Sequence, residues 1–110
     1  SDENHIPLKE NLKMLKKLML PDGKQPDIVE IPMPAPVYYE GQRLPASYAN
    51  FYICNAGVIV PTFRCKQDQM AIDLLAQCFP NRPVIGIDSV EIIWGLGSWH
   101  CLSQQEPAVE

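Results

Sequence analysis

The chain has 110 residues, of which 46% are hydrophobic and 20% charged, and its net charge is −4 at pH 7. These figures are typical of a folded soluble protein with a modest core, and the acidic charge gives no basic face for nucleic acid. No apolar run approaches the ~20 residues that cross a bilayer, so we expect no membrane contact. The polar start, SDENHIPLKE, is unlike an export signal, and we expect a cytoplasmic protein.

The first expected element is a helix near the N-terminus, because four apolar residues recur at helical spacing behind Pro7. These residues are Leu8, Leu12, Leu15 and Met19. The turn at 21–23 (PDG) ends the helix. Residues 27–33 (DIVEIPM) then alternate in the manner of a strand, and residues 34–48, rich in proline and glycine, are expected to form a long loop.

The middle of the chain predicts a hairpin followed by a helix. Two β-rich runs, 51–54 and 58–61, flank residues 55–57 (NAG), in which the glycine is free to take a positive φ. Residues 67–79 have the pattern of an amphipathic helix that Asp68 can cap. The apolar face of this helix consists of Ala71, Leu75 and Cys78.

The last third predicts a short buried strand over 83–87 (PVIGI), then a helical turn over 88–94 that the glycines of 95–97 (GLG) break. The element order is α-β followed by β-β-α-β, which indicates an α/β fold in a single domain spanning 1–110. The expected core combines apolar residues of both halves. They are Leu12, Leu15, Ile31, Phe51, Ile53, Val58, Val60, Leu75, Val84 and Ile85.

The cysteines bear on metal binding and on redox state. They are Cys54, Cys65, Cys78 and Cys101. No two of them have the Cys-x-x-Cys spacing of a zinc site, and the histidines, His5 and His100, lie at opposite ends of the chain, so we expect no metal. Without an export signal we expect reduced thiols, with Cys54 and Cys78 buried in apolar surroundings.

Cys101 follows a glycine-containing loop, and the residues alone leave its role open. It is either a small buried hydrophobe or a nucleophile, whose thiolate needs a base or a positive charge nearby. His100 is adjacent, but in an extended segment neighbouring side chains point to opposite faces, so its expected role is a structural hydrogen bond. His5 lies in a polar lead-in and is expected to be solvated. A base for Cys101 would therefore come from elsewhere.

Three runs of the chain closely resemble the C-terminal portion of agmatine deiminases. They are NHIPLKENLKML (4–15), GQRLPASYANFYICNAGVIVPTF (41–63) and RPVIGIDSVEIIWGLGSWHCLSQQEP (82–107). These enzymes belong with the bacterial-type peptidyl-arginine deiminases to the pentein, or guanidino-group-modifying, superfamily. The resemblance implies part of a five-bladed α/β propeller, with about one complete ββαβ module and the end of the preceding one.

The resemblance also implies a site. The family's glycine–histidine–cysteine motif falls on residues 95–101 (GLGSWHC), which places the nucleophilic cysteine at Cys101. Gly97 and Ser98 are implied to shape the loop that presents the sulfur, with backbone groups close to the substrate. No metal or organic cofactor is implied. The family's base histidine and its guanidinium-binding carboxylates lie upstream of anything that matches residue 4.

Some positions depart from the family pattern or have two interpretations. The departures are Ala56, the Arg64-Cys65 pair, Trp99 and Ser103. Glu30, Glu40 and Asp88 are acidic residues near strand ends, but none matches the family's carboxylates, and each is expected to be solvated or to cap a loop. Trp94 and Trp99 either wall a guanidinium pocket by cation–π contact or, as burial habits favour, simply pack.

The resemblance implies a hydrolase that converts agmatine and water into N-carbamoylputrescine and ammonia, a step in putrescine and polyamine biosynthesis. One alternative is a truncated, non-catalytic module that oligomerises or binds partners, and a weaker one is a peptidyl-arginine deiminase. The 110 residues alone are expected to be inactive, because the base and the carboxylates are missing. Part of a closed propeller leaves sheet edges uncovered, so we expect a homo-oligomer or pairing with a missing N-terminal portion.

Overall fold

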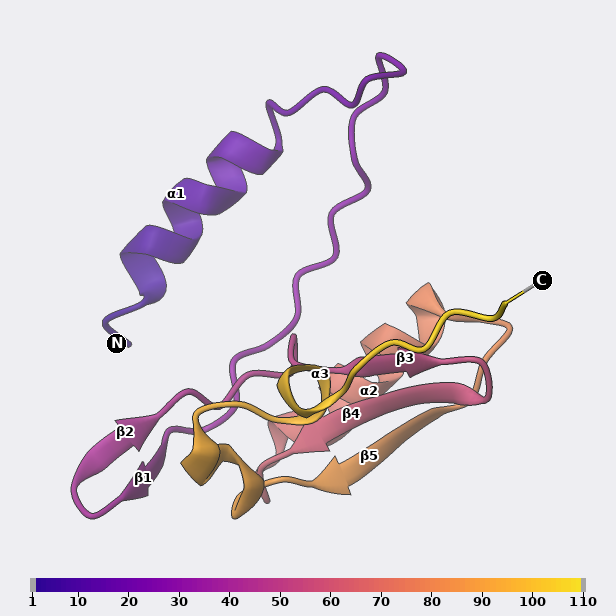
Figure 1. Cartoon of the computed structure of the whole chain (residues 1–110). Helices are drawn as coiled ribbons and strands as arrows, with labels where there is room; N and C mark the ends of the chain where they lie inside the picture. The colour runs from indigo at the N-terminus through magenta and orange to yellow at the C-terminus, as the bar shows by residue number, and fades with distance from the viewer. Residues whose placement is uncertain (1, 110) are drawn as a thin grey trace. The chain divides into compact units, whose positions relative to one another are not determined.

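The computed structural model describes residues 2–109 and divides into two compact units, Ser1–Glu30 and Ile31–Glu110. Each unit is described by itself. Among the described residues the first unit contains a single helix, and the second contains five strands, one long helix and two short helical turns (Figure 1). The α/β class is confirmed, whereas the single domain over 1–110 and the propeller remain predictions.

The helix of the first unit, α1 (His5–Leu15), confirms the expected N-terminal helix. It begins two residues before Pro7, which the first turn tolerates because an N–H there has no intrahelical partner. Met19 lies beyond the helix end. Leu15, predicted in the core, is exposed, and α1 is the only helix or strand in the described part of this unit.

Residues 27–33 form no strand, so that prediction was wrong. An alternating pattern becomes a strand only when its backbone groups find a partner strand, and none among the described residues pairs with this segment. The three prolines at 26, 32 and 34 also lack the N–H that a ladder needs.

The segment 34–48, predicted to be a loop, contains a short hairpin. Strand β1 (Val37–Tyr39) pairs antiparallel with β2 (Gln42–Leu44). The two turn residues both have positive φ, 48° at Glu40 and 79° at Gly41, as two-residue hairpin turns require. The carboxylate-bearing Glu40 therefore sits at a hairpin tip.

The main sheet has the order β3-β4-β5, with β3 at Tyr52–Cys54, β4 at Gly57–Thr62 and β5 at Val84–Asp88. β4 is antiparallel to β3 and parallel to β5, and helix α2 (Gln67–Cys78) connects β4 to β5. This arrangement confirms the predicted β-β-α-β order of the second half. The sheet lies beside α2 in Figure 1, with the short helix α3 next to β3.

Gly57 and Asp68 act differently from their predicted roles. Gly57 does not have a positive φ; instead a Cβ there would lie 2.7 Å from the backbone oxygen of Pro83, so glycine is required by close contact. Lys66, not Asp68, is the N-cap of α2 and makes no side-chain cap. Asp68 lies one residue inside the helix and accepts hydrogen bonds from groups that precede it.

Asp68 joins the loop before α2 to Tyr48. Its carboxylate accepts hydrogen bonds from the backbone N–H groups of Phe63 and Cys65, each at a distance of 3.0 Å, and from the Tyr48 hydroxyl at 2.6 Å. Partial burial by itself would raise the pKa of Asp68, but these hydrogen bonds outweigh it and lower that pKa below its ordinary value. Burial, together with the bond to Asp68, raises the pKa of Tyr48.

The core of the second unit lies where the sheet meets α2 and the segments flanking it. The buried hydrophobic residues are Leu44, Tyr48, Val58, Val60, Phe63, Ala71, Leu75 and Ile93. Val58, Val60 and Leu75 were predicted to lie in the core. Ala71 was predicted only to lie on the apolar face of its helix, and the remaining four were not predicted to be buried. The predicted Ile53 and Ile85 are 44% and 55% exposed. Ile53 lies on the edge strand β3, and Ile85 points away from α2, because side chains alternate along a strand and the neighbouring Gly86 faces that helix. Cys78, at the end of α2, is exposed as well.

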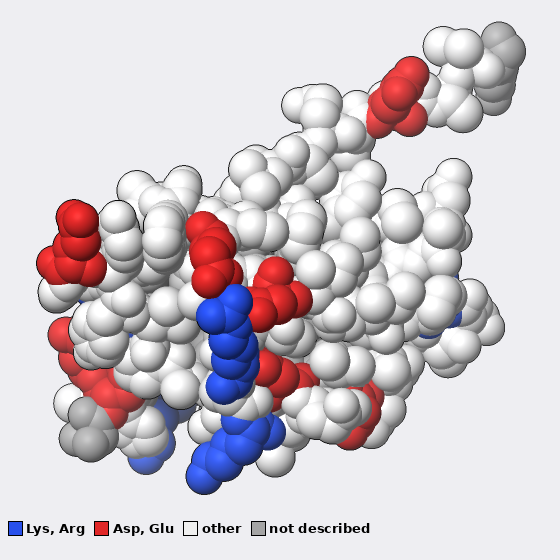
Figure 2. Space-filling view, turned by 90° about the horizontal axis from the view of Figure 1, so that it is seen from below, with Lys and Arg blue, Asp and Glu red and all other residues white. Residues whose placement is uncertain are grey.

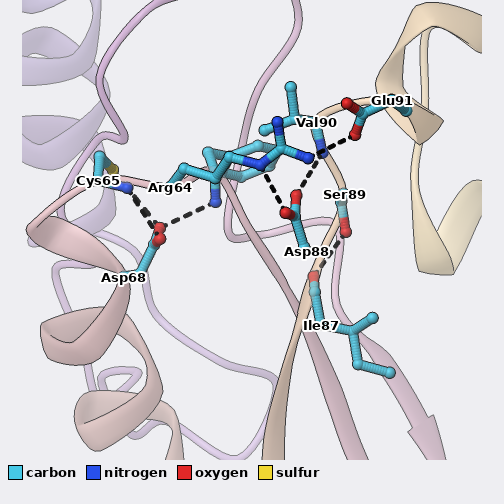
Figure 3. A network of polar contacts seen from close by, with 9 residues as sticks. Arg64, Cys65, Asp68, Ile87, Asp88, Ser89, Val90 and Glu91 are labelled. Carbon is cyan, nitrogen blue, oxygen red and sulfur yellow. Dashed lines mark hydrogen bonds and ion pairs between the residues drawn. The ribbon is translucent and has the colours of Figure 1, made fainter.

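An ion-pair network ties the ends of β4 and β5 together (Figure 3). The Arg64 guanidinium donates from Nε to Asp88 over 2.6 Å and from Nη2 to Glu91 over 2.8 Å, and it lowers the pKa of Asp88. All three side chains are exposed, so solvent screens the ion pairs and the network fixes local geometry more than it adds stability. Arg64 has a φ of 56°.

Charged side chains do not form a broad field of one sign. On the face drawn in Figure 2, Lys and Arg lie directly beside Asp and Glu, and much of the surface around them is uncharged. Among residues 2–109 there is no helix with the length and apolar character that a membrane span requires.

Candidate active site

Cys101 lies on α3 (Trp99–Leu102), a single helical turn that follows the 3₁₀ helix η1 (Ile92–Gly95). The helical turn expected over 88–94 is thus present, four residues later than predicted at its start. Leu96 breaks it with a φ of 66°. The Cys101 residue is exposed and its thiol is free.

Asn50, two residues before β3, contacts Cys101 at two atoms. Its Nδ2–H donates to the Cys101 sulfur over 3.1 Å, and its Oδ1 accepts from the Cys101 backbone N–H over 3.2 Å. Only the oxygen of a carboxamide can accept from an N–H, so the second contact fixes which end of the amide faces the sulfur. An N–H donor directed at the sulfur stabilises the thiolate.

The sequence interpretation missed Asn50. The residue stands within the run 41–63 that carries the family resemblance, but it is separated from Cys101 by 51 positions. An asparagine next to a strand also has a common structural role in turns. Only the fold reveals that Asn50 and Cys101 meet.

Gly97 is required by its contact with the cysteine. A Cβ at this position would lie 2.5 Å from the Cys101 Cβ and 2.9 Å from its sulfur, closer than side chains approach one another. At Gly95 an added Cβ would meet nothing within 4 Å. Of the two glycines in the motif, Gly97 is therefore the one that lets the loop pass close behind the sulfur.

Ser98 is buried, and its hydroxyl donates to the backbone oxygen of Asn50 over 3.2 Å. Gly97 is buried as well. Both residues lie shortly before the cysteine in the chain and are shielded from solvent. Their predicted role, to shape the loop that presents the sulfur and to bring backbone groups close to a substrate, stays a prediction.

His100 lies in a helical turn, not in the extended segment that was expected. Neighbouring side chains of residues 99–102 therefore diverge by ~100° rather than 180°. The backbone of His100 makes the local hydrogen bonds, its N–H donating to Asn50 and its carbonyl accepting from Ser103. No hydrogen bond of its imidazole to Cys101 is found among the described residues, so the two do not form a nucleophile–base pair here.

An open cleft of about 620 Å³ lies between β3 and the segment that follows α3. His100 lines it together with Ser103, Gln104, Phe51 and Tyr52. No charged side chain of the described residues lines this cleft. A guanidinium bound here would need its carboxylate partners from other parts of the protein.

The remaining candidates lie away from the cysteine. Asp88 is paired with Arg64, and Glu40 is in the β1–β2 turn. Trp94 stacks on Tyr39 with ring centroids 4.1 Å apart, which supports a packing role. Glu30 and His5 belong to the first unit, where both are exposed.

Trp99, at the start of α3, is half-buried, and its indole Nε1–H has no hydrogen-bond partner among the described residues. No group of three or more His, Cys, Asp and Glu residues in the described part of the chain is arranged to hold a metal ion. All four cysteines are free thiols; Cys54 is half-buried rather than fully buried.

Comparison with known proteins places this arrangement in a family. Residues 1–107 match the model of the Porphyromonas-type peptidyl-arginine deiminases. A Legionella pneumophila protein, provisionally named as an agmatine deiminase, is 35% identical over 107 residues, covering 96% of this chain and 31% of its own length. This chain therefore spans about a third of the length of such relatives.

Solved structures of proteins named as deiminases are also similar to this chain. A Porphyromonas gingivalis protein, provisionally assigned as an arginine deiminase, superposes with a TM-score of 0.91 at 40% identity, covering 96% of this chain and 31% of its own. A C. jejuni agmatine deiminase, solved as a cysteine-to-serine variant with substrate bound, gives a TM-score of 0.79 at 38% identity over 90% of this chain and 28% of its own. The chain belongs to the Porphyromonas-type peptidyl-arginine deiminase family.

Proposed function

We propose that the protein containing this chain is an agmatine deiminase and that Cys101 is its nucleophile. The supporting observation is the local geometry: an exposed free thiol, an Asn50 amide N–H directed at its sulfur over 3.1 Å, and a glycine whose missing side chain makes room for it. The relatives named agmatine deiminases support the substrate. The product, N-carbamoylputrescine, is a precursor of putrescine.

In the proposed reaction, the Cys101 thiolate attacks the guanidinium carbon of agmatine. The carbon–nitrogen bond to one terminal amino group then breaks, that nitrogen takes up a proton and leaves as ammonia, and a covalent amidino-thioether remains. Water attacks the same carbon, the carbon–sulfur bond breaks, and N-carbamoylputrescine leaves as the thiolate is restored. Each turnover consumes one water and releases one ammonia, and the steps need no metal or organic cofactor.

The residues described here supply only part of this site. A histidine base and the carboxylates that hold the guanidinium are proposed to lie in a portion of the protein outside these residues. Gly97 and Ser98 are proposed to shape the loop, with their backbone groups next to the substrate. Residues 1–110 by themselves are accordingly proposed to be inactive. We place the protein in the cytoplasm, where free thiols remain reduced.

Replacing Cys101 tests the proposal. In the intact natural protein, Cys101→Ser should lower agmatine turnover by at least about 10³-fold, because the serine hydroxyl is not activated as a thiolate is. Ammonia release and N-carbamoylputrescine formation are measured together. Cys78→Ser is the matched control, since Cys78 is an exposed free thiol on α2, and it should retain full turnover. Wild-type turnover by Cys101→Ser would refute the assignment.

The family description supports a second candidate, a peptidyl-arginine deiminase with the same cysteine chemistry. The two differ in what the site must accept, a free aminobutyl chain or a peptide backbone. Side-by-side turnover of agmatine and an arginyl peptide by the intact protein separates them. We expect agmatine to be turned over faster.

A third candidate is a truncated, non-catalytic module that binds copies of itself or a missing N-terminal portion. The observation that favours it is the exposed apolar surface on the edge strands, where Ile53 and Ile85 are 44% and 55% exposed. The mass of the natural protein decides between this module and an enzyme. A natural product of about 12.4 kDa, the mass of this chain, would exclude the enzyme.

A further inference from the structure

The backbone carbonyl of Asn50 is held from the cysteine loop. Its oxygen accepts from the Ser98 hydroxyl over 3.2 Å and from the His100 N–H over 3.3 Å, which occupies both of its lone pairs. On the other side, the Asn50 N–H donates to the Ser47 carbonyl over 3.3 Å. Of these three contacts, the one from Ser98 is the only one made by a side chain.

Ser98 does not make the capping hydrogen bond that a serine in its position usually makes. It is the N-cap of α3, where a serine hydroxyl commonly accepts from an N–H of the first helical turn. Here it makes no such cap and donates to Asn50 instead. The residue is 1% exposed, so water cannot take the place of this hydrogen bond if the hydroxyl is removed.

We propose that Ser98 is a positioning residue that sets the reactivity of the Cys101 thiol by fixing Asn50. The chain of contacts runs from the Ser98 hydroxyl to the Asn50 carbonyl, through the Asn50 residue, and from its Nδ2–H to the Cys101 sulfur. The inference rests on the proposed role of Cys101 as nucleophile, but its test does not depend on turnover.

Asn50 contacts Ser98 through its backbone carbonyl and Cys101 through its side-chain amide, so a change at the first contact affects the second. Its amide stabilises the thiolate only while Nδ2 stays within hydrogen-bond distance of the sulfur, now 3.1 Å. Without the Ser98 hydroxyl, the Asn50 carbonyl keeps only the 3.3 Å bond from the His100 N–H. Asn50 is then held less firmly, by that bond, by its own N–H to Ser47 and by the Cys101 N–H at its Oδ1, and its Nδ2 donor spends less time on the sulfur.

The experiment is the rate of alkylation of Cys101 by iodoacetamide between pH 6 and 10, on the intact natural protein, with each cysteine followed separately by peptide mass spectrometry. Ser98→Ala should lower the rate at pH 7 by about threefold to tenfold, as expected for an indirectly weakened hydrogen bond to a charged group. Cys78 in the same sample serves as a reference thiol and should not change.

Ser103→Ala is the matched control. Its hydroxyl also belongs to the cysteine loop and donates to the His100 carbonyl over 2.8 Å, without touching Asn50. It should leave the pH profile of Cys101 as in the wild type. A profile of Ser98→Ala that coincides with the wild type, or an equal change in Ser103→Ala, overturns the proposal.

Ser98→Gly is a second variant without the hydroxyl, made in case Ser98→Ala does not fold. Thermal unfolding is recorded for both Ser98 variants, and if neither folds cooperatively, Ser98 is a folding residue and the positioning role is wrong. If agmatine is the substrate, the folded variants should lower kcat with little change in KM. Turnover by Cys101→Ser would refute the nucleophile while leaving the effect of Ser98 on the thiol intact, so the two failures are distinguishable.

Discussion

The contact between Gly97 and Cys101 shows how one missing carbon atom shapes the loop. Gly97 needs no unusual φ, so its identity is explained by space alone. A Cβ at residue 97 would also lie 3.9 Å from the Asn50 Nδ2, so the glycine, the cysteine and the asparagine amide meet at one place. The cysteine is thereby in contact both with the segment before β3 and with its own preceding turn.

Gly97→Ala should displace the cysteine, because the new methyl group would lie 2.5 Å from the Cys101 Cβ. We expect iodoacetamide alkylation of Cys101 at pH 7, and turnover by the intact protein, to change by about tenfold or more, as misplacement of a catalytic group commonly does. Gly95→Ala adds the same methyl group into open space and should behave as wild type. Equal effects of the two substitutions would mean that crowding at residue 97 is unimportant.

Individual site residues were predictable to different degrees. Cys101 was predicted as the nucleophile from its motif, a run of seven residues that resembles the family, and this stays a prediction. Asn50 could not be predicted, since its partner is 51 positions away and the contact depends on how β3 is placed beside α3. The direction of His100 was misjudged because the local conformation was taken as extended, and a single helical turn leaves almost no periodic pattern to read.

At the start of α2, the Asp68 carboxylate accepts hydrogen bonds from three residues. Asp68 accepts from Phe63, Cys65 and Tyr48, and so connects the end of β4, the helix and the segment before β3. The pKa of Asp68 is lowered in the folded protein, so its ionised form is favoured by folding. Its stabilising effect is therefore complete above the unfolded pKa of about 3.9 and is lost as the pH falls through the lower folded value.

Asp68→Asn should destabilise the protein at pH 7, because it removes the charge from the acceptor of the 2.6 Å bond from Tyr48. The expected loss in free energy of unfolding is about 1–3 kcal/mol. Urea unfolding at pH 7 and at pH 3 should show the difference from wild type shrinking at the lower pH. Asp73→Asn, on the exposed side of α2, is the control and should have little effect at either pH. A difference that grows on acidification would contradict the assignment.

Secondary structure followed the sequence where long-range pairing supported a strong local pattern. β3, β4, α2 and β5 appear close to their predicted bounds, because each has a clear apolar period and a partner. Residues 27–33 have the alternating apolar pattern of a strand, but no strand among the described residues pairs with them. The β1–β2 hairpin was missed because three-residue arms are too short to show alternation, and only the turn residues Glu40-Gly41 indicate it.

At the scale of the whole chain, the exposed apolar residues of the edge strands are the main unexplained feature. Ile53 on β3 is 44% exposed, and Ile85 and Ile87 on β5 are 55% and 38% exposed. Apolar side chains on open strand edges favour association with another sheet or another chain. The sequence could anticipate this only through the resemblance, because nothing local marks a strand as an edge.

The 110-residue chain should therefore self-associate at micromolar concentration. Sedimentation velocity of residues 1–110 should give a weight-average mass above 12.4 kDa that rises with concentration. Ile85→Lys should shift the distribution towards the monomer, because a charge on an edge strand opposes pairing. Ile6→Lys is the control, because Ile6 is a still more exposed apolar site, 69% against 55% for Ile85, and lies on α1 rather than on a strand. A folded monomer at all concentrations would show that these edges are tolerated without a partner.

The bond between the Asn50 amide and the Cys101 sulfur also has a kinetic meaning. Closing a loop of 51 residues costs more chain entropy than closing a turn, so contacts of this separation form after local ones. During refolding, the thiol should lack its amide partner until the strand region carrying Asn50 has met the C-terminal turn. The rate at which iodoacetamide alkylates Cys101, followed in time, would then change as this contact forms and so report the last stages of assembly.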